Sequence, residues 1–144
     1  MLITYSISFA FNADSHPLVN ARVLTILLEN LIAVDRVYLR STKEAGHSVP
    51  ALYRAGVVYG RTRTWDAIPD VKAKEFGDCK SLSAWYCAEE REAGRFVKPV
   101  FRWIQNPYTK VRDFHILVQT PKGFEDPSKI LGMTDHNQFL DPQR

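Results

Sequence analysis

The sequence predicts one domain that mixes α-helices with β-strands. Apolar side chains have helical spacing in residues 18–40 and 80–93, and runs of β-branched and aromatic residues at 97–105, 112–120 and 124–126 are typical of strands. A chain of 144 residues, 45% hydrophobic and 24% charged, has the size and composition of a single globular domain. Its net charge of +3 is too small to indicate a nucleic-acid partner.

The N-terminal third is expected to supply a strand and the longest helix. Residues 2–11 are rich in β-branched and aromatic side chains and predict a strand. In the helix over residues 18–40 the polar side chains fall within a stripe about 60° wide, so most of its surface is apolar. We expect this helix to be buried in the core, with half of a partner interface as the alternative. The stripe consists of Arg22, Thr25, Glu29, Arg36 and Arg40.

The middle of the chain is expected to begin irregularly and then to form a capped helix. Residues 52–59 favour a short extended piece, and residues 61–76 favour a loop with a short turn of helix. Asp78 is the natural N-cap of the helix over residues 80–93, with Ser81 at N3. Gly94 is expected to end this helix.

Cys79 is therefore placed at a helix N-terminus. A thiol there meets the positive end of the helix dipole and free backbone N–H groups, which favours the nucleophilic thiolate. The second cysteine, Cys87, lies about 12 Å further along the same helix, too far away for a disulfide. The cysteines and the four histidines (His16, His47, His115 and His136) show no metal-ligand spacing, so neither a metal nor another cofactor is expected.

A tight turn at residues 121–123 is expected to bring a histidine to an aspartate. His115 lies in the middle of the predicted strand 112–120, and Asp126 follows the turn. A histidine in such an apolar strand is costly unless it has a polar partner. Cys79, His115 and Asp126 together supply the nucleophile, the base and the orienting acid of a thiol triad. The backbone N–H of Cys79 is expected to help hold the oxyanion.

Two other acidic residues compete for the orienting position. We expect Asp113 to point to the opposite face of the strand from His115, and we interpret Asp78 as a helix cap. Asp126 is therefore the preferred acid. After Gly132 the chain is polar and is expected to be loosely attached.

With these residues in place, the chain resembles the transglutaminase-like superfamily, a branch of the papain-like thiol enzymes. It is most similar to small stand-alone members from bacteriophage genomes. The resemblance covers residues 53–133 and rests on Gly77-Asp78-Cys79-Lys80-Ser81-Leu82, Phe114-His115-Ile116-Leu117-Val118, Glu125-Asp126-Pro127-Ser128 and Leu131-Gly132-Met133.

The resemblance implies an α+β fold with a papain-like, transglutaminase-like core. In that core a cysteine-bearing helix packs on an antiparallel sheet that carries His115 and Asp126. Residues 1–144 would form one such domain, with its core at residues 53–133 and with the strand and long helix of residues 1–45 packed on it. Cys79 would be the nucleophile, His115 the base and Asp126 the orienting acid. Trp65 is a candidate oxyanion donor, with a role in covering the core as the alternative.

The expected function is thiol-dependent acyl transfer or amide hydrolysis through a thioester. Water as acceptor gives a peptidase or amidase, and an amine gives a transglutaminase. The alternative is a non-catalytic phage virion or assembly component that keeps the fold. A protein or peptide substrate is expected, the resemblance implies phage structural proteins as partners, and neither nucleic acid nor a membrane is expected. Residues 1–11 lack a basic segment and are too short to span a bilayer, so no signal peptide or transmembrane helix is expected. The host cytoplasm is the expected location, with virion association in a phage setting.

Overall fold

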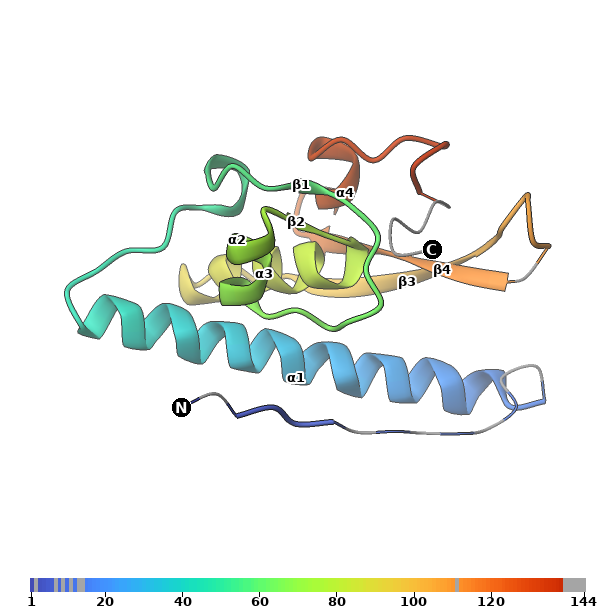
Figure 1. Ribbon diagram of the computed structural model, residues 1–144, viewed down its shortest axis with the longest axis horizontal. Coiled ribbons are helices and arrows are strands. Elements are labelled where there is room, and N and C mark those ends of the chain that lie inside the picture. The colour runs from blue at the N-terminus through green and yellow to red at the C-terminus, as the bar shows by residue number, and fades with distance from the viewer. Residues whose placement is uncertain are drawn as a thin grey trace.

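The structure, a computed structural model, describes residues 1, 3–6, 8, 10, 12, 15–110 and 112–138 and has a mixed α+β fold. β1 and β2 pair in parallel, and β3, β4 and β5 form a small antiparallel sheet in that order (Figure 1). In chain order the elements are α1 (Pro17–Glu44), the 3-10 turn η1 (Leu52–Arg54), β1 (Val58–Tyr59), α2 (Ile68–Lys74), β2 (Phe76–Gly77), α3 (Cys79–Glu92), β3 (Lys98–Gln105), β4 (Arg112–Thr120), β5 (Gly123–Glu125) and α4 (Pro127–Ile130).

The central element is α3, which contributes to two hydrophobic clusters. One cluster joins Ala84, Cys87 and Ala88 of α3 to α1 and β4, and the other joins Leu82 and Trp85 to η1, α2 and the segment after α4. All five side chains are fully buried. Since α3 is held from both sides, its N-terminal residue has a fixed position relative to β4.

The start and end of α3 follow from its local sequence, as predicted. The Asp78 side chain accepts a hydrogen bond from the backbone N–H of Ser81 at 3.4 Å, which confirms the N-cap. Gly94 has a φ of 80°, a left-handed conformation that glycine adopts without strain.

The hairpin between β4 and β5 is also confirmed. Thr120 pairs with Gly123 and Val118 pairs with Glu125, so Pro121 and Lys122 alone form the turn. The chain leaves the sheet directly after Glu125, and α4 begins. This arrangement places the residue after β5 beside the middle of β4.

Three residues of the polar stripe of the long helix α1 form ion pairs with α3. Glu29 pairs with Arg91 at 2.7 Å, and Arg36 and Arg40 pair with Glu92 at 2.6 and 2.8 Å. The expectation of a mostly buried core helix is therefore wrong, because ion pairs occupy part of the side that packs on α3 and much of the apolar surface is left exposed. Its buried residues are Leu28, Leu31, Ile32 and Asp35, whereas Val19, Ile26, Val34 and Val37 are exposed.

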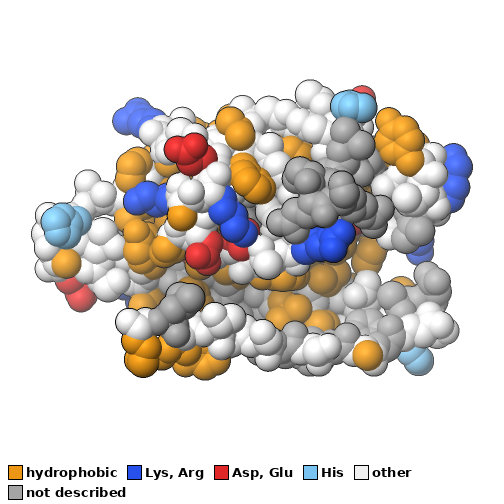
Figure 2. Space-filling model, in the orientation of Figure 1, with side chains coloured by type: hydrophobic (Ala, Val, Ile, Leu, Met, Phe, Trp, Pro, Cys, Tyr) orange, Lys and Arg blue, Asp and Glu red, His pale blue; other side chains and the backbone are white. Residues whose placement is uncertain are grey.

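By length and composition α1 is also apolar enough to cross a membrane, with a mean hydropathy of 1.5 over its best window. Core helices of soluble proteins and N-terminal signal sequences meet the same criterion. On the face shown in Figure 2, acidic and basic side chains are interspersed and are not gathered into one basic patch.

The two ends of the chain differ from expectation. The described residues among 1–10 are exposed and form no strand, which contradicts the predicted strand 2–11 packed on the core; positions 2, 7, 9 and 11 lie outside the described residues. Met133 is buried with Leu131 beside it, so the chain beyond Gly132 begins with an anchored residue. Residues 139–144 of the predicted loose tail lie outside the described residues.

Candidate active site

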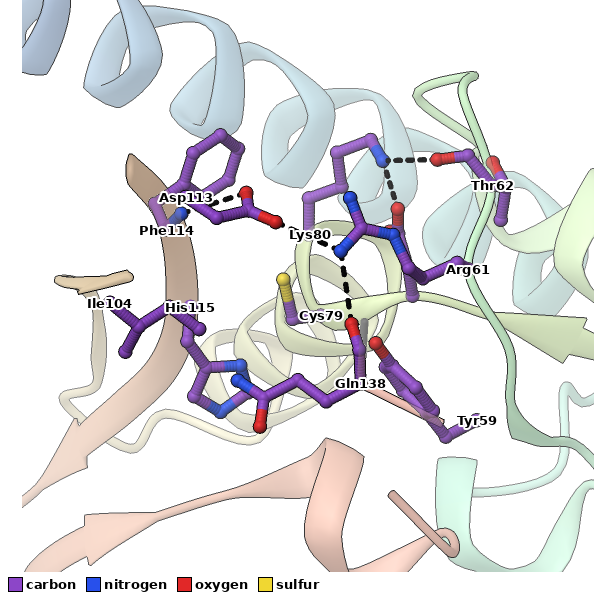
Figure 3. A pocket seen from close by; sticks show the side chains of 11 residues that line it. Tyr59, Arg61, Thr62, Cys79, Lys80, Ile104, Asp113, Phe114, His115 and Gln138 are labelled. Atoms are coloured by element: carbon purple, nitrogen blue, oxygen red, sulfur yellow. Dashed lines mark hydrogen bonds and ion pairs between the residues drawn. The ribbon is translucent and has the colours of Figure 1, made fainter. Parts of the chain in front are cut away.

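Cys79 and His115 line the same pocket (Figure 3). Cys79 is the first residue of α3, and His115 lies in the middle of β4, so the pocket forms where the helix N-terminus meets the sheet. The other lining residues described are Tyr59, Arg61, Thr62, Asp78, Lys80, Ile104, Asp113, Phe114 and Gln138. The volume of this cavity is about 130 Å³.

Asp126 meets His115 as the hairpin predicts. Its Oδ2 lies 2.8 Å from Nε2 of His115, and its Oδ1 accepts a hydrogen bond from the backbone N–H of Lys129 at 3.3 Å. Asp126 is thus both the partner of the imidazole and the N-cap of α4. Burial would raise the pKa of Asp126, but the hydrogen bond and charge of His115, together with Lys129, hold this pKa below its usual value.

The pairing with Asp126 determines which imidazole nitrogen is available for proton transfer. An ionised carboxylate can only accept, so Nε2 of His115 carries the shared proton. Nδ1 of the neutral ring is then an acceptor and remains for the pocket. His115 is buried, so this orientation is held by packing as well as by the hydrogen bond.

The ionisation of Cys79 differs from the prediction. Burial raises the pKa of the Cys79 thiol to about 12, and the Asp78 carboxylate acts in the same direction. A hydrogen bond from the backbone N–H of Ile116 and the charge of Lys80 act in the opposite direction and are outweighed. The raised pKa favours the neutral thiol over the thiolate, because desolvation exceeds the opposing effects of Ile116 and Lys80.

Trp65 does not line the pocket that contains Cys79. It is partly buried, packs against the cluster between α1 and α3, and lies beneath the Lys80 ammonium at 5.9 Å. The structure therefore favours the core-covering alternative over an oxyanion donor.

Tyr59 also lines the pocket, which the sequence did not predict. Its ring enters the pocket in Figure 3, and burial and the neighbouring Cys79 raise the pKa of its hydroxyl. A neutral hydroxyl is a hydrogen-bond donor, so Tyr59 could help hold an oxyanion together with the Cys79 backbone N–H. The two-residue strand β1 carries it, too short to recognise by alternation.

Asp113 shares a face of β4 with His115, contrary to our expectation. Side chains two positions apart in a strand point to the same side, and both residues line the pocket. Asp113 nevertheless does not compete with Asp126, because its Oδ2 accepts from Nη1 of Arg61 at 2.8 Å. Neither Arg61 nor Asp113 was predicted to line the site.

A buried ion pair lies beside the cysteine. Lys80 pairs with Asp78 and also donates from Nζ to the backbone carbonyl of Thr62 at 3.2 Å. Burial raises the pKa of Asp78, although Lys80 and the capping hydrogen bond from Ser81 act to lower it. Asp78 is thus confirmed as a cap and also fixes the chain on each side of Cys79.

Comparison with protein-family models, with curated proteins and with solved structures finds no match. Among the residues that the structure describes, no group of three or more His, Cys, Asp and Glu side chains could hold a metal ion.

Proposed function

We propose that this protein carries out thiol-dependent acyl transfer or amide hydrolysis, with Cys79 as nucleophile. The observation that supports this most directly is the 2.8 Å hydrogen bond between His115 and Asp126, made by a histidine that shares a pocket with a helix-tip cysteine. We further propose that the fold is a papain-like, transglutaminase-like core, because α3 carries the cysteine and the antiparallel hairpin carries the histidine and leads into the aspartate.

The acylation step follows from the assigned proton positions. Sγ of Cys79 attacks the carbonyl carbon of an amide while Nδ1 of His115 takes the thiol proton. The carbonyl oxygen becomes an oxyanion, which the Cys79 backbone N–H and the Tyr59 hydroxyl stabilise. The C–N bond then breaks, and the departing nitrogen takes the proton from His115, leaving a thioester on Cys79.

The raised pKa of Cys79 supports a role for His115 as a general base during attack. The proton moves as the S–C bond forms, and the imidazolium that results lies against the ionised Asp126. Asp126 is therefore a positioning residue that makes proton transfer to His115 favourable.

In the second step water or an amine attacks the thioester. His115 removes a proton from this acceptor, and the Cys79 sulfur leaves and takes a proton to restore the thiol. Water gives a carboxylic acid, whereas a lysine-type amine gives a new amide. Both outcomes use the same side chains.

The direct test is thioester formation. The protein is incubated with casein as an amide donor and with a fluorescent primary amine, and ammonia, new N-termini and labelled casein are measured. We expect product from wild type and from Cys87→Ala, and none from Cys79→Ser or His115→Ala. Product at equal rates from wild type and Cys79→Ser would overturn the proposal.

A non-catalytic virion or assembly component is the competing proposal. The exposed apolar residues of α1, among them Ile26, Val34 and Val37, favour it because they suit a protein partner. It predicts that Cys79→Ser leaves assembly unchanged and that substitution of Val34 or Val37 by a charged residue impairs it.

A further inference from the structure

The segment Thr134–Gln138 reaches the pocket that contains Cys79 through its last residue. Gln138 lines this pocket, and its side chain extends toward His115 in Figure 3. Its backbone carbonyl accepts a hydrogen bond from Nη1 of Arg61 at 2.9 Å. The same nitrogen donates to Asp113 at 2.8 Å, so Arg61 is held in place while it binds the segment.

Hydrogen bonds within the segment give it a defined shape. The backbone N–H of Thr134 donates to Oδ1 of Asn137 at 2.7 Å, and that of Asn137 donates to Oγ1 of Thr134 at 3.2 Å. The backbone N–H of Gln138 donates to the Thr134 carbonyl at 3.1 Å. Met133, directly before the segment, is buried in the core. The segment therefore joins a core anchor to a contact inside the pocket.

A residue of a bound peptide could make the same contacts as Gln138. A backbone carbonyl is bound by a fixed guanidinium, and the side chain of the same residue points into the reaction pocket. We propose that Arg61, positioned by Asp113, binds the main-chain carbonyl of a peptide substrate, and that Thr134–Gln138 occupies this subsite as an internal pseudosubstrate. This rests on the proposed function for the assignment of a substrate, but the occupancy itself can be tested without turnover.

The arrangement has two physical consequences. Gln138 fills part of the pocket that contains Cys79, and a peptide substrate must displace it before reaching the thiol. Because Arg61 can bind either carbonyl, the internal segment and an added peptide compete for one donor.

The experiment measures alkylation of Cys79 by iodoacetamide in a Cys87→Ala background, where Cys79 is the only thiol. We expect Asn137→Ala to raise the alkylation rate about fivefold, the factor expected for loss of one net hydrogen bond, because the Asn137 side chain bonds the Thr134 N–H and the Gly132 carbonyl. We expect Gln138→Ala to raise the rate as well, because it removes the side chain that lines the pocket while keeping the backbone carbonyl that Arg61 binds. His136→Ala is the matched control, because His136 lies in the same segment, is exposed and does not line the pocket, and its rate should stay at the starting value.

The amidated peptide Thr-Asp-His-Asn-Gln, which reproduces the segment, is then added to the Gln138→Ala variant. We expect it to restore protection of Cys79, and we expect Arg61→Lys in the Gln138→Ala variant to weaken that protection while thermal unfolding shows that the protein is folded. The proposal would be overturned if Gln138→Ala and Asn137→Ala both left the alkylation rate of Cys79 unchanged. It would also be overturned if Arg61→Lys left the protection by the peptide unchanged.

The two proposals fail in different ways. Protection by the peptide needs only a bound ligand and a reachable thiol, whereas the proposed function needs product from an amide donor. If the peptide protects Cys79 in the Gln138→Ala variant but this variant forms no product, the peptide subsite is supported and the proposed enzymatic function is refuted. If the variant forms product but the peptide gives no protection, the proposed function is supported and the subsite is refuted.

Discussion

The raised pKa of Cys79 predicts an unusual pH dependence of alkylation. At pH 8 a thiol with a pKa of about 12 is ionised in about one molecule in ten thousand, whereas an ordinary cysteine with a pKa of about 8.5 is ionised in about one in four. Iodoacetamide reacts with the thiolate. We therefore expect Cys79 to react about three orders of magnitude more slowly at pH 8 than a small-molecule thiol, with a rate that still rises above pH 9.

The assay is the rate of mass increase in the Cys87→Ala protein between pH 6 and 10, compared with the same protein carrying His115→Ala. Since burial sets the ionisation of the resting thiol, the His115→Ala profile should keep the same shape. A rate that levels off below pH 8 in the parent protein and loses this plateau in His115→Ala would refute the reasoning. It would show instead that Cys79 and His115 form an ion pair before substrate binds.

Three further perturbations have expected outcomes in chemical denaturation. Asp126→Ala should lose activity and about 1 kcal/mol of unfolding free energy, because the N-cap of α4 is missing. Asp126→Asn can still accept a hydrogen bond from the Lys129 N–H, so it should lose activity with little change in stability. Burial raises the folded-state pKa of Asp35 to about 7, so the folded protein favours the protonated carboxyl. As the pH rises from 4 to 8, the unfolding free energy of wild type should fall by up to about 4 kcal/mol more than that of Asp35→Asn. Parallel plots of unfolding free energy against pH for the two proteins would contradict this. Lys80→Met should destabilise by about 3 kcal/mol, because it leaves the buried Asp78 without its ion-pair partner, and an unchanged midpoint would exclude that role.

Features set by neighbouring residues could be predicted from the sequence. The Asp78 cap, Gly94 at the end of α3 and the turn between β4 and β5 each depend on residues within a few positions of one another, and all are observed. The meeting of His115 and Asp126 follows from that turn, since a two-residue hairpin leaves little freedom in register.

Features that depend on distant neighbours were predicted incorrectly. The polar stripe of α1 finds ion-pair partners on α3, and hydropathy cannot distinguish such a stripe from one that faces water. For Trp65 the sequence left two roles open, and the structure places it outside the pocket that Tyr59 lines. The expectation that Asp113 and His115 point to opposite faces was wrong for a local reason. The two residues are two positions apart in the strand, and strand alternation places them on the same face.

The sequence by itself determined the order of Cys79, His115 and Asp126 along the chain, and it placed them on a helix tip, a strand and the end of a hairpin. Those assignments use local hydrogen bonding and side-chain periodicity, which act over a few residues. Only the tertiary structure decided that desolvation raises the pKa of Cys79 and that Arg61 binds the backbone carbonyl of Gln138. Desolvation and long-range hydrogen bonds depend on residues that are far apart in the sequence. Lys80 and Thr62 are 18 positions apart, and Arg61 and Gln138 are 77 positions apart. The packing of α3 brings such segments together.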